Sequence, residues 1–96
     1  MYVRLVRLAF QPGREEVAQR MGEHLVSHIG SQPGCLGVTC FGDAETSEYG
    51  LYVRWETREA ADAAAPIIRP QLDTFLAGNA VRPPEIGLYE VIRSSE

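Results

Sequence analysis

The sequence predicts an α+β fold in which four antiparallel strands form one sheet and two helices cover a single face of it. Four segments have the apolar content of strands, two have the period of helices, and their order is strand, helix, strand, strand, helix, strand. With right-handed crossovers, this order gives the ferredoxin-like βαββαβ arrangement. The length of 96 residues predicts one domain over residues 1–96.

The first predicted strand, Tyr2–Phe10, is apolar on both faces. One face carries Val3, Leu5 and Ala9, and the other carries Tyr2, Val6, Leu8 and Phe10. Such a strand needs cover on both sides. Gln11, Pro12 and Gly13 then turn the chain.

The first helix is predicted from about Arg14 to Ile29, and Gly30 ends it. At a helical period one stripe of this segment is apolar, which indicates an amphipathic helix on a sheet. The stripe consists of Val17, Ala18, Met21, Leu25 and Ile29.

A hairpin is predicted next, because Cys35–Phe41 and the strand from Tyr49 to Glu56 are joined by the short polar segment Gly42–Glu48. Cys35 and Cys40 are five residues apart, so an unbroken strand would place them on opposite faces, roughly 16 Å apart and too far for a disulfide. Their spacing, with no histidine nearby, also fails as a zinc site. We expect two free, buried thiols and no metal.

The second helix is predicted to be interrupted. Thr57 is a good N-cap residue, but Pro66 and Pro70 each lack a backbone donor. We therefore expect a first helix over Arg58–Ala65 and a short second one over Pro70–Leu76. The last strand is predicted over Ile86–Arg93.

Two helices on one side leave the other face of the sheet uncovered. An apolar face of that extent usually marks an interface, so the sequence predicts a homodimer with the sheets packed face to face, a dimeric α/β barrel. Tyr52, Arg54 and Glu56 point toward that face, where Arg54 and Glu56 suit an ion pair across the interface better than catalysis.

Charge and hydropathy exclude two classes of partner. The chain has 9 basic and 13 acidic residues, a net charge of -4 and no lysine, which argues against nucleic acid and anionic membranes. No apolar run approaches the roughly 18 residues of a membrane span, and Arg4 and Arg7 interrupt what a signal peptide would need. We expect a cytoplasmic protein.

Trp55 is the best candidate for the wall of a small-molecule pocket. It lies where a strand passes into a helix, with its ring on the apolar face of the strand. Such pockets are mostly apolar and aromatic, and the residues predicted to complete this one are Tyr49, Leu51, Ile68, Leu72 and Phe75. The alternative is that Trp55 only fills the core.

His24 and His28 lie one turn apart on the first helix, at or beside its apolar stripe. Either could look into the space between helix and sheet and serve as a ligand or a general base. Alternatively, each lies at the edge of the stripe, with its ring nitrogens satisfied by water or backbone.

Three features together resemble the antibiotic biosynthesis monooxygenase (ABM) family. They are P-G-C-L-G at Pro33–Gly37, V-R-W-E-T-R-E-A at Val53–Ala60, and the proline-containing helix that follows. The resemblance covers nearly the whole chain. It implies a ferredoxin-like homodimer with an apolar cavity in each subunit and, in active members, oxygenation of quinols or polyphenols without metal, flavin or other cofactor.

The resemblance also implies roles for particular residues. Trp55 matches the family's tryptophan at the strand–helix junction and would shape the pocket, while His24, His28 or a tyrosine would assist deprotonation. Leu51 and Ala61 stand where some oxygenases carry asparagine and tyrosine, and no histidine follows His28. The residues used by the haem-degrading branch are absent at matching places. The alternative function is a non-catalytic dimer of this architecture, with a stress-related or regulatory role, that binds a small hydrophobic ligand.

Overall fold

The four strands form one antiparallel sheet in the order β2-β3-β1-β4, which confirms the predicted ferredoxin-like fold. The computed structural model describes residues 1–95. The elements are β1 (Tyr2–Ala9), α1 (Glu15–Gly30), β2 (Cys35–Asp43), β3 (Glu48–Trp55), α2 (Arg58–Leu76) and β4 (Glu85–Glu90). Among these described residues, no helix is both long and apolar enough to cross a membrane.

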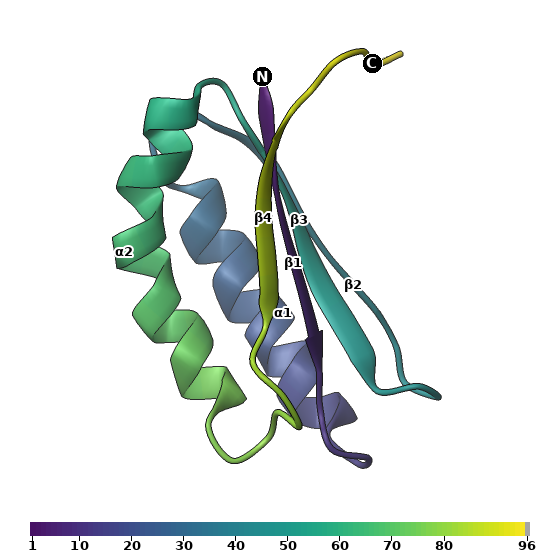
Figure 1. Cartoon of the computed structure of the whole chain (residues 1–96). Coiled ribbons are helices and arrows are strands. Elements are labelled where there is room, and N and C mark those ends of the chain that lie inside the picture. Colours follow the sequence, from purple (N-terminus) through teal and green to yellow (C-terminus); the bar gives the residue numbers. More distant parts are fainter. Residues whose placement is uncertain (96) are drawn as a thin grey trace.

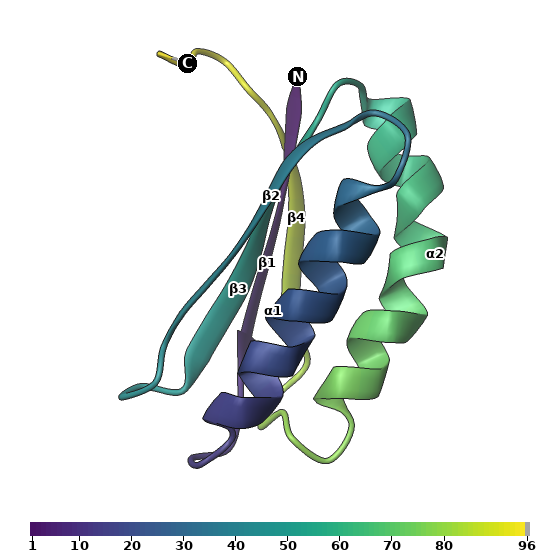
Figure 2. The same ribbon diagram turned by 180° about the vertical axis from the view of Figure 1, so that it is seen from behind.

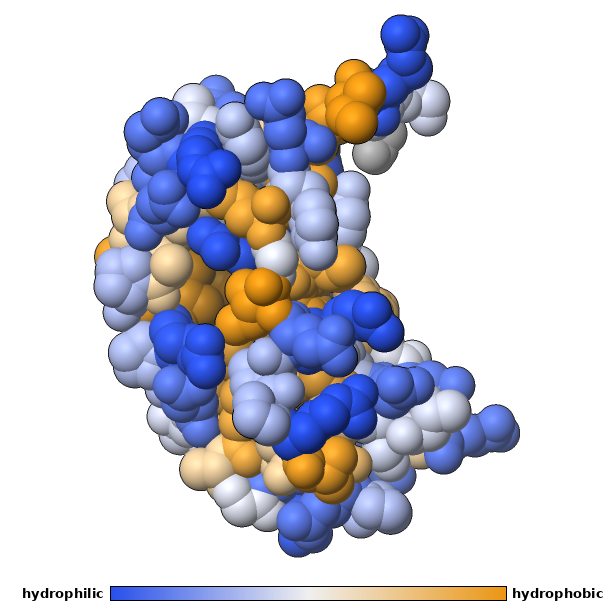
Figure 3. Space-filling model, viewed as in Figure 1, coloured by the Kyte–Doolittle hydropathy of each residue, from blue (hydrophilic) through white to orange (hydrophobic). Residues whose placement is uncertain are grey.

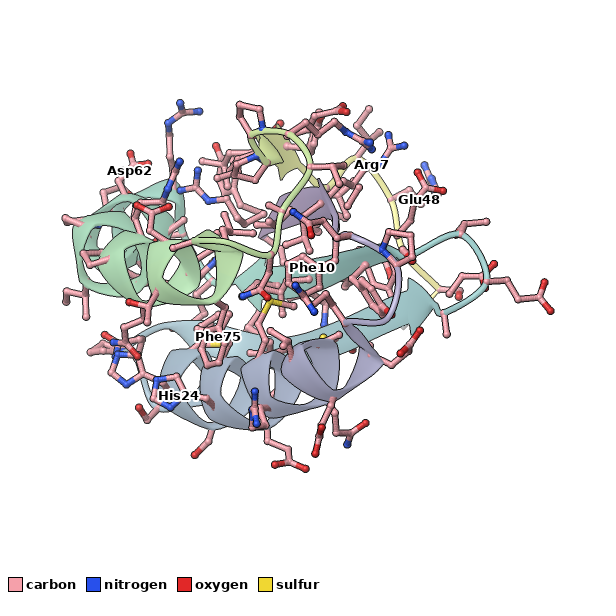
Figure 4. All side chains as sticks on the ribbon, turned by 90° about the horizontal axis from the view of Figure 1, so that it is seen from below. Arg7, Phe10, His24, Glu48, Asp62 and Phe75 are labelled. Carbon is pink, nitrogen blue, oxygen red and sulfur yellow. The ribbon has the colours of Figure 1, made fainter. Side chains whose placement is uncertain are left out.

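Both helices lie on the same face of the sheet, as the two opposite views show (Figures 1 and 2). Side chains along each strand alternate between this inner face and the outer one. In Figure 4, Phe10 points into the space between sheet and helices, whereas Arg7 lies on the side of the sheet away from them. The element order therefore produces two layers, with one sheet face left open.

The hydrophobic core fills the space between the two layers. On β3, Leu51, Val53 and Trp55 are buried, while Tyr52 between them is exposed, as a strand with period two requires. On α1 the predicted stripe is confirmed, because Ala18, Met21, Leu25 and Ile29 are buried and Val17 packs against the core. Ala61, Ala64 and Leu72 of α2 and Val6, Leu8 and Phe10 of the first strand segment complete the core.

The prediction that α2 is interrupted is wrong, since one helix runs through Arg58–Leu76 with both prolines inside it. Pro66 and Pro70 are four residues apart, so they share a face of the helix, and both are exposed to solvent. Water can therefore satisfy the carbonyls that lose a donor, and the helix continues. Its start at Thr57 is as predicted: the Thr57 hydroxyl accepts a hydrogen bond from the Ala60 amide at 3.1 Å.

The prediction that the two cysteines face opposite sides is also wrong. A β-bulge lies between Cys35 and Gly37, and it inserts one extra residue into β2. As a result Cys35 pairs with Trp55 and Cys40 with Leu51, two residues on the inner face of β3. Both thiols are free and partly buried against the core.

The last strand ends three residues earlier than predicted, at Glu90 instead of Arg93. Its partner strand decides this, because Glu90 pairs with Tyr2, the first residue of β1. Beyond that pair, the Val91 amide is bonded to the N-terminal segment, donating to the Met1 carbonyl at 2.9 Å.

The open face of the sheet carries several large apolar side chains. Phe41, Tyr52 and Tyr89 are 45%, 40% and 58% exposed, and half-buried Val3 and Leu5 lie on the same face of β1. The molecule is hollowed on this side, between the C-terminal tail and the β2–β3 hairpin (Figures 1 and 3). The expectation of an uncovered apolar face is therefore correct for this chain.

Candidate functional site

A cavity of about 230 Å³ lies between the inner face of the sheet and α2. Figure 3 shows apolar side chains gathered between α2 and β4, bordered by hydrophilic ones. The sheet contributes Arg4, Val6, Leu51, Val53, Trp55 and Ile86, and the helices contribute Ile29, Ala61, Ala65, Ile68, Arg69 and Leu72. Ten of these twelve side chains are apolar, so the cavity suits an apolar ring.

Trp55 lines this cavity, at the junction that the sequence predicts. It is the last residue of β3, is 2% exposed, and pairs with Tyr2 of β1. The following turn is fixed by two bonds: the Glu56 amide donates to the Gly34 carbonyl at 2.8 Å, and Thr57 caps α2. The indole N–H of Trp55 is buried and has no hydrogen-bond partner within residues 1–95.

Arg4 is a cavity residue that sequence reasoning missed. Its side chain is 21% exposed and reaches from β1 to α2, where Nη2 donates to the Ala61 carbonyl at 3.4 Å. Asp62 lies 3.8 Å from the same nitrogen, on the side of α2 away from α1 (Figure 4). A signal was available, because Arg4 shares its strand face with Val6 and Leu8, and an arginine on an inner face needs a partner.

A second guanidinium borders the cavity on α2. Arg69 is half-exposed, and its Nε lies 2.8 Å from the Asp73 carboxylate, one turn along the helix. This arginine is therefore held by its own helix, unlike Arg4, which spans two elements.

The structure brings together most of the residues predicted to line the pocket. Trp55, Leu51, Ile68 and Leu72 all line the cavity. Tyr49 and Phe75 do not: the Tyr49 ring packs on Phe10, with centroids 5.5 Å apart, and the Phe75 ring packs on His24 at 5.7 Å. Tyr49 lies six residues before Trp55, so it covers the other end of the core. A role in binding substrate stays a prediction for all six residues.

The two histidines lie at the boundary between α1 and α2, outside the lining of the cavity. Figure 4 shows His24 beside Phe75, and its Nε2 is hydrogen-bonded to Gln71 Oε1 on α2. His28 stacks on His24, with centroids 6.1 Å apart, and its own Nε2 is buried without a partner within the described chain. Their proposed role in deprotonation is untested, and the lining of the cavity gives it no support.

Burial and neighbouring charge keep the protons on the other candidate bases. Burial raises the pKa of the Tyr49 phenol and of the Cys40 thiol. A hydrogen bond to the Glu90 carboxylate, with its negative charge, raises the pKa of Tyr2. These groups are therefore protonated at neutral pH.

The described residues that line the cavity include no aspartate, glutamate, histidine, tyrosine or cysteine. Nor do residues 1–95 contain a group of three or more histidine, cysteine or acidic side chains that could hold a metal ion. What the arrangement offers chemically is an apolar space, partly open to solvent, with the guanidinium groups of Arg4 and Arg69 at its wall. Such a space can hold an aromatic ring and stabilise negative charge on it.

Comparison with known proteins gives a family and a set of similar folds. The model of the antibiotic biosynthesis monooxygenase family matches residues 1–65. No curated protein matches the sequence.

Three solved structures illustrate the similarity of fold. An antibiotic biosynthesis monooxygenase is 16% identical, with a TM-score of 0.81 over 97% of this chain and 100% of its own. A variant of SnoaB, a cofactor-independent oxygenase from Streptomyces nogalater, is also 16% identical, with a TM-score of 0.78 over 98% and 95% of the two chains. Rv0793 from Mycobacterium tuberculosis is 15% identical, with a TM-score of 0.78 over 99% and 98%. At these identities the likeness shows the fold.

Proposed function

Because this chain belongs to the antibiotic biosynthesis monooxygenase family, we propose that it oxygenates a quinol or polyphenolic aromatic small molecule without metal or flavin. The observation that carries the proposal is the apolar cavity of about 230 Å³ with Trp55 in its wall. An apolar protein cavity of about 150 Å³ already binds benzene. The cavity here therefore has room for one substituted ring or two small fused rings.

The chemistry needs only what a phenolic substrate and dioxygen supply. The ring gives up its hydroxyl proton and donates electrons to dioxygen from the phenolate. One oxygen atom forms a bond to a ring carbon that bears hydrogen, ortho or para to the ionised hydroxyl, and the carbon–hydrogen bond there breaks. The second oxygen atom leaves as water with that hydrogen and the hydroxyl proton. A phenol and one dioxygen thus give a quinone and one water, and a 1,4-quinol, whose para carbon already carries oxygen, gives a hydroxyquinone and one water.

The protein's part in this reaction is to bind the ring, exclude water and stabilise negative charge. The apolar walls serve the first two tasks, since removing water strengthens the electrostatic interactions that remain. Trp55 would fix the plane of the ring, because aromatic side chains favour offset or edge-to-face contacts with another ring. Leu51, Ile68 and Leu72 would form the rest of the binding surface.

The test is oxygen consumption with a panel of quinols and polyphenols in isotopically labelled dioxygen. Monooxygenation places one labelled atom in the organic product and the other in water. Spontaneous oxidation of a quinol instead gives labelled hydrogen peroxide and a quinone without label. Trp55→Ala should abolish the enzymatic rate, and Trp55→Phe, which keeps an aromatic ring, should retain part of it. If no member of the panel gives labelled product above the rate in buffer, the proposal fails.

We also propose that the active form is a homodimer in which two copies pack their sheets face to face. Support comes from the exposed aromatic side chains Phe41, Tyr52 and Tyr89, on a face that no element within residues 1–95 covers. A second copy would bury these side chains and complete a dimeric α/β barrel.

A further inference from the structure

We propose that Arg4 is the anion-binding residue of the cavity and that the substrate is an aromatic compound whose hydroxyl is acidic enough to be ionised at neutral pH. This inference rests on the proposed function and narrows its substrate class from phenols in general to acidic ones. It also assigns the charge recognition to a residue on β1.

The first argument is the sign of charge around the cavity. Within the described part of the chain, its only charged lining residues are Arg4 and Arg69, although the chain as a whole carries a net charge of -4. A cation held against apolar walls attracts an anion more strongly than it would in water, because the surrounding dielectric is lower. The cavity therefore complements a ligand that is apolar over its body and negative at one point.

The second argument is the spare hydrogen-bonding capacity of Arg4. A guanidinium carries several N–H donors, and the hydrogen bond of Arg4 to protein is a long one, 3.4 Å to the Ala61 carbonyl. Its ion pair with Asp62 is 3.8 Å long, and Asp62 is 59% exposed and shared with Arg58 at 3.7 Å. Arg69, in contrast, has a 2.8 Å ion pair with Asp73. Both guanidiniums keep N–H donors, but the charge of Arg69 is compensated by a carboxylate in direct contact, whereas that of Arg4 is not. Arg4 is therefore the cation better placed to bind an anionic ligand.

The third argument is the absence of a general base from the wall. None of the described residues that line the cavity can accept a proton at neutral pH, and burial raises the pKa of Tyr49, which keeps that phenol protonated. The hydroxyl must then lose its proton to water before or during binding. A neighbouring guanidinium lowers the pKa of a bound hydroxyl, and an acidic hydroxyl needs the least help.

The test measures binding, without oxygenation, using two probes that differ by one methyl group and by charge. 2-Hydroxy-1,4-naphthoquinone is an anion at neutral pH, its methyl ether is neutral, and neither is a quinol that dioxygen can oxidise. Calorimetry under argon gives their affinities. The protein should bind the anion about tenfold or more tightly than the ether, as one charge-assisted hydrogen bond would produce. Arg4→Gln should remove that preference, and Arg4→Lys should keep part of it.

Arg69→Gln is the matched control, since it removes the other cation at the cavity and should leave most of the preference intact. Melting curves of all variants show that each is folded. Equal affinity of the normal protein for both probes, or an unchanged preference in Arg4→Gln, overturns the inference. Failure here is distinct from failure of the proposed function. Oxygenation of neutral phenols without a preference for anions would overturn only the inference about Arg4. A preference for anions without oxygenation of any phenol would overturn only the proposed oxygenation.

Discussion

Gly34 and Ala60 lie so close together that a methyl group built on Gly34 would come within 2.6 Å of the Ala60 side chain. Gly34 belongs to the turn after α1, and Ala60 to the first turn of α2. The Gly34 carbonyl also accepts the Glu56 amide at 2.8 Å. This turn is therefore packed directly against the junction that positions Trp55. A side chain added at Gly34 would displace residues next to the cavity wall.

We predict that Gly34→Ala lowers the free energy of unfolding by about 2–4 kcal/mol, because it adds a steric clash to an unfavourable backbone conformation. Gly34 has a φ of +82°, and Gly13 has a nearly identical φ of +84°, but a methyl group added at Gly13 would meet no atom within 4 Å. Gly13→Ala should therefore cost only the backbone part, about 1–2 kcal/mol. Urea unfolding of both variants measures the difference, and equal losses would show that the contact with Ala60 does not matter.

A charge on the open face of the sheet should dissociate the proposed homodimer. Tyr52 is 40% exposed in this chain and would be buried by a second copy. Tyr52→Asp would place a carboxylate in the interface without a partner, and we expect the dissociation constant to rise by about tenfold or more.

Val26 provides the control for this experiment, because it is 36% exposed on α1, on the opposite side of the molecule. Val26→Asp should leave the assembly unchanged. Sedimentation equilibrium over a range of concentrations gives the mass of each variant. A normal protein that remains a single copy at micromolar concentration would contradict the proposed assembly.

The stability of the protein should fall in mild alkali, in part because of Cys40. Burial raises the pKa of this thiol above its ordinary value of 9.0. Between the ordinary and the raised pKa, the unfolded chain has lost the proton while the folded chain still holds it. Ionisation then favours the unfolded state, and the free energy of unfolding falls as pH rises.

Cys40→Ala should flatten this decline, measured by urea unfolding at intervals from about pH 8 to about pH 10. Part of the decline should remain, since the pKa values of Tyr2 and Tyr49 are raised as well. A slope identical to that of the unaltered protein would mean that the Cys40 thiol ionises as readily in the folded state as in the unfolded one.

The histidines should contribute little to oxygenation, because neither lines the cavity. Loss of a general base lowers a rate by about 10²–10⁴-fold, so the effect of a substitution separates a histidine that acts as the base from one that does not. We expect His24→Ala and His28→Ala each to change the rate of oxygenation by less than about twofold, well below the loss of a general base. A large loss in His28→Ala, with unchanged affinity for the hydroxynaphthoquinone probe, would instead assign the proton transfer to His28.

The order of the elements and their faces were predictable from the sequence, since both depend on local periodicity. Three such local patterns are confirmed by the structure, each set by residues close together in the sequence: the apolar stripe of α1, the alternation along β3 and the capping of α2 by Thr57. Likewise, Trp55 could be placed at a pocket wall, because a change of period marks the strand–helix junction in the sequence itself.

Other features depended on the surroundings of a residue and became visible only in the tertiary structure. The bulge beside Cys35 moves the side chain of that cysteine to the inner face of the sheet, and the pairing of β2 with β3 determines where the bulge lies. α2 remains continuous because Pro66 and Pro70 face solvent, which their sequence spacing does not reveal.

The sequence by itself determined which residues are apolar, at which period they recur, and therefore which elements form and in what order. Only the tertiary structure decided which of those residues share a cavity. Arg4 and Ala61 are 57 positions apart, and they meet because α2 packs across β1. Contacts of that kind depend on the register of strands and on how a helix lies across a sheet, and these are set by packing of the whole core instead of by any local pattern.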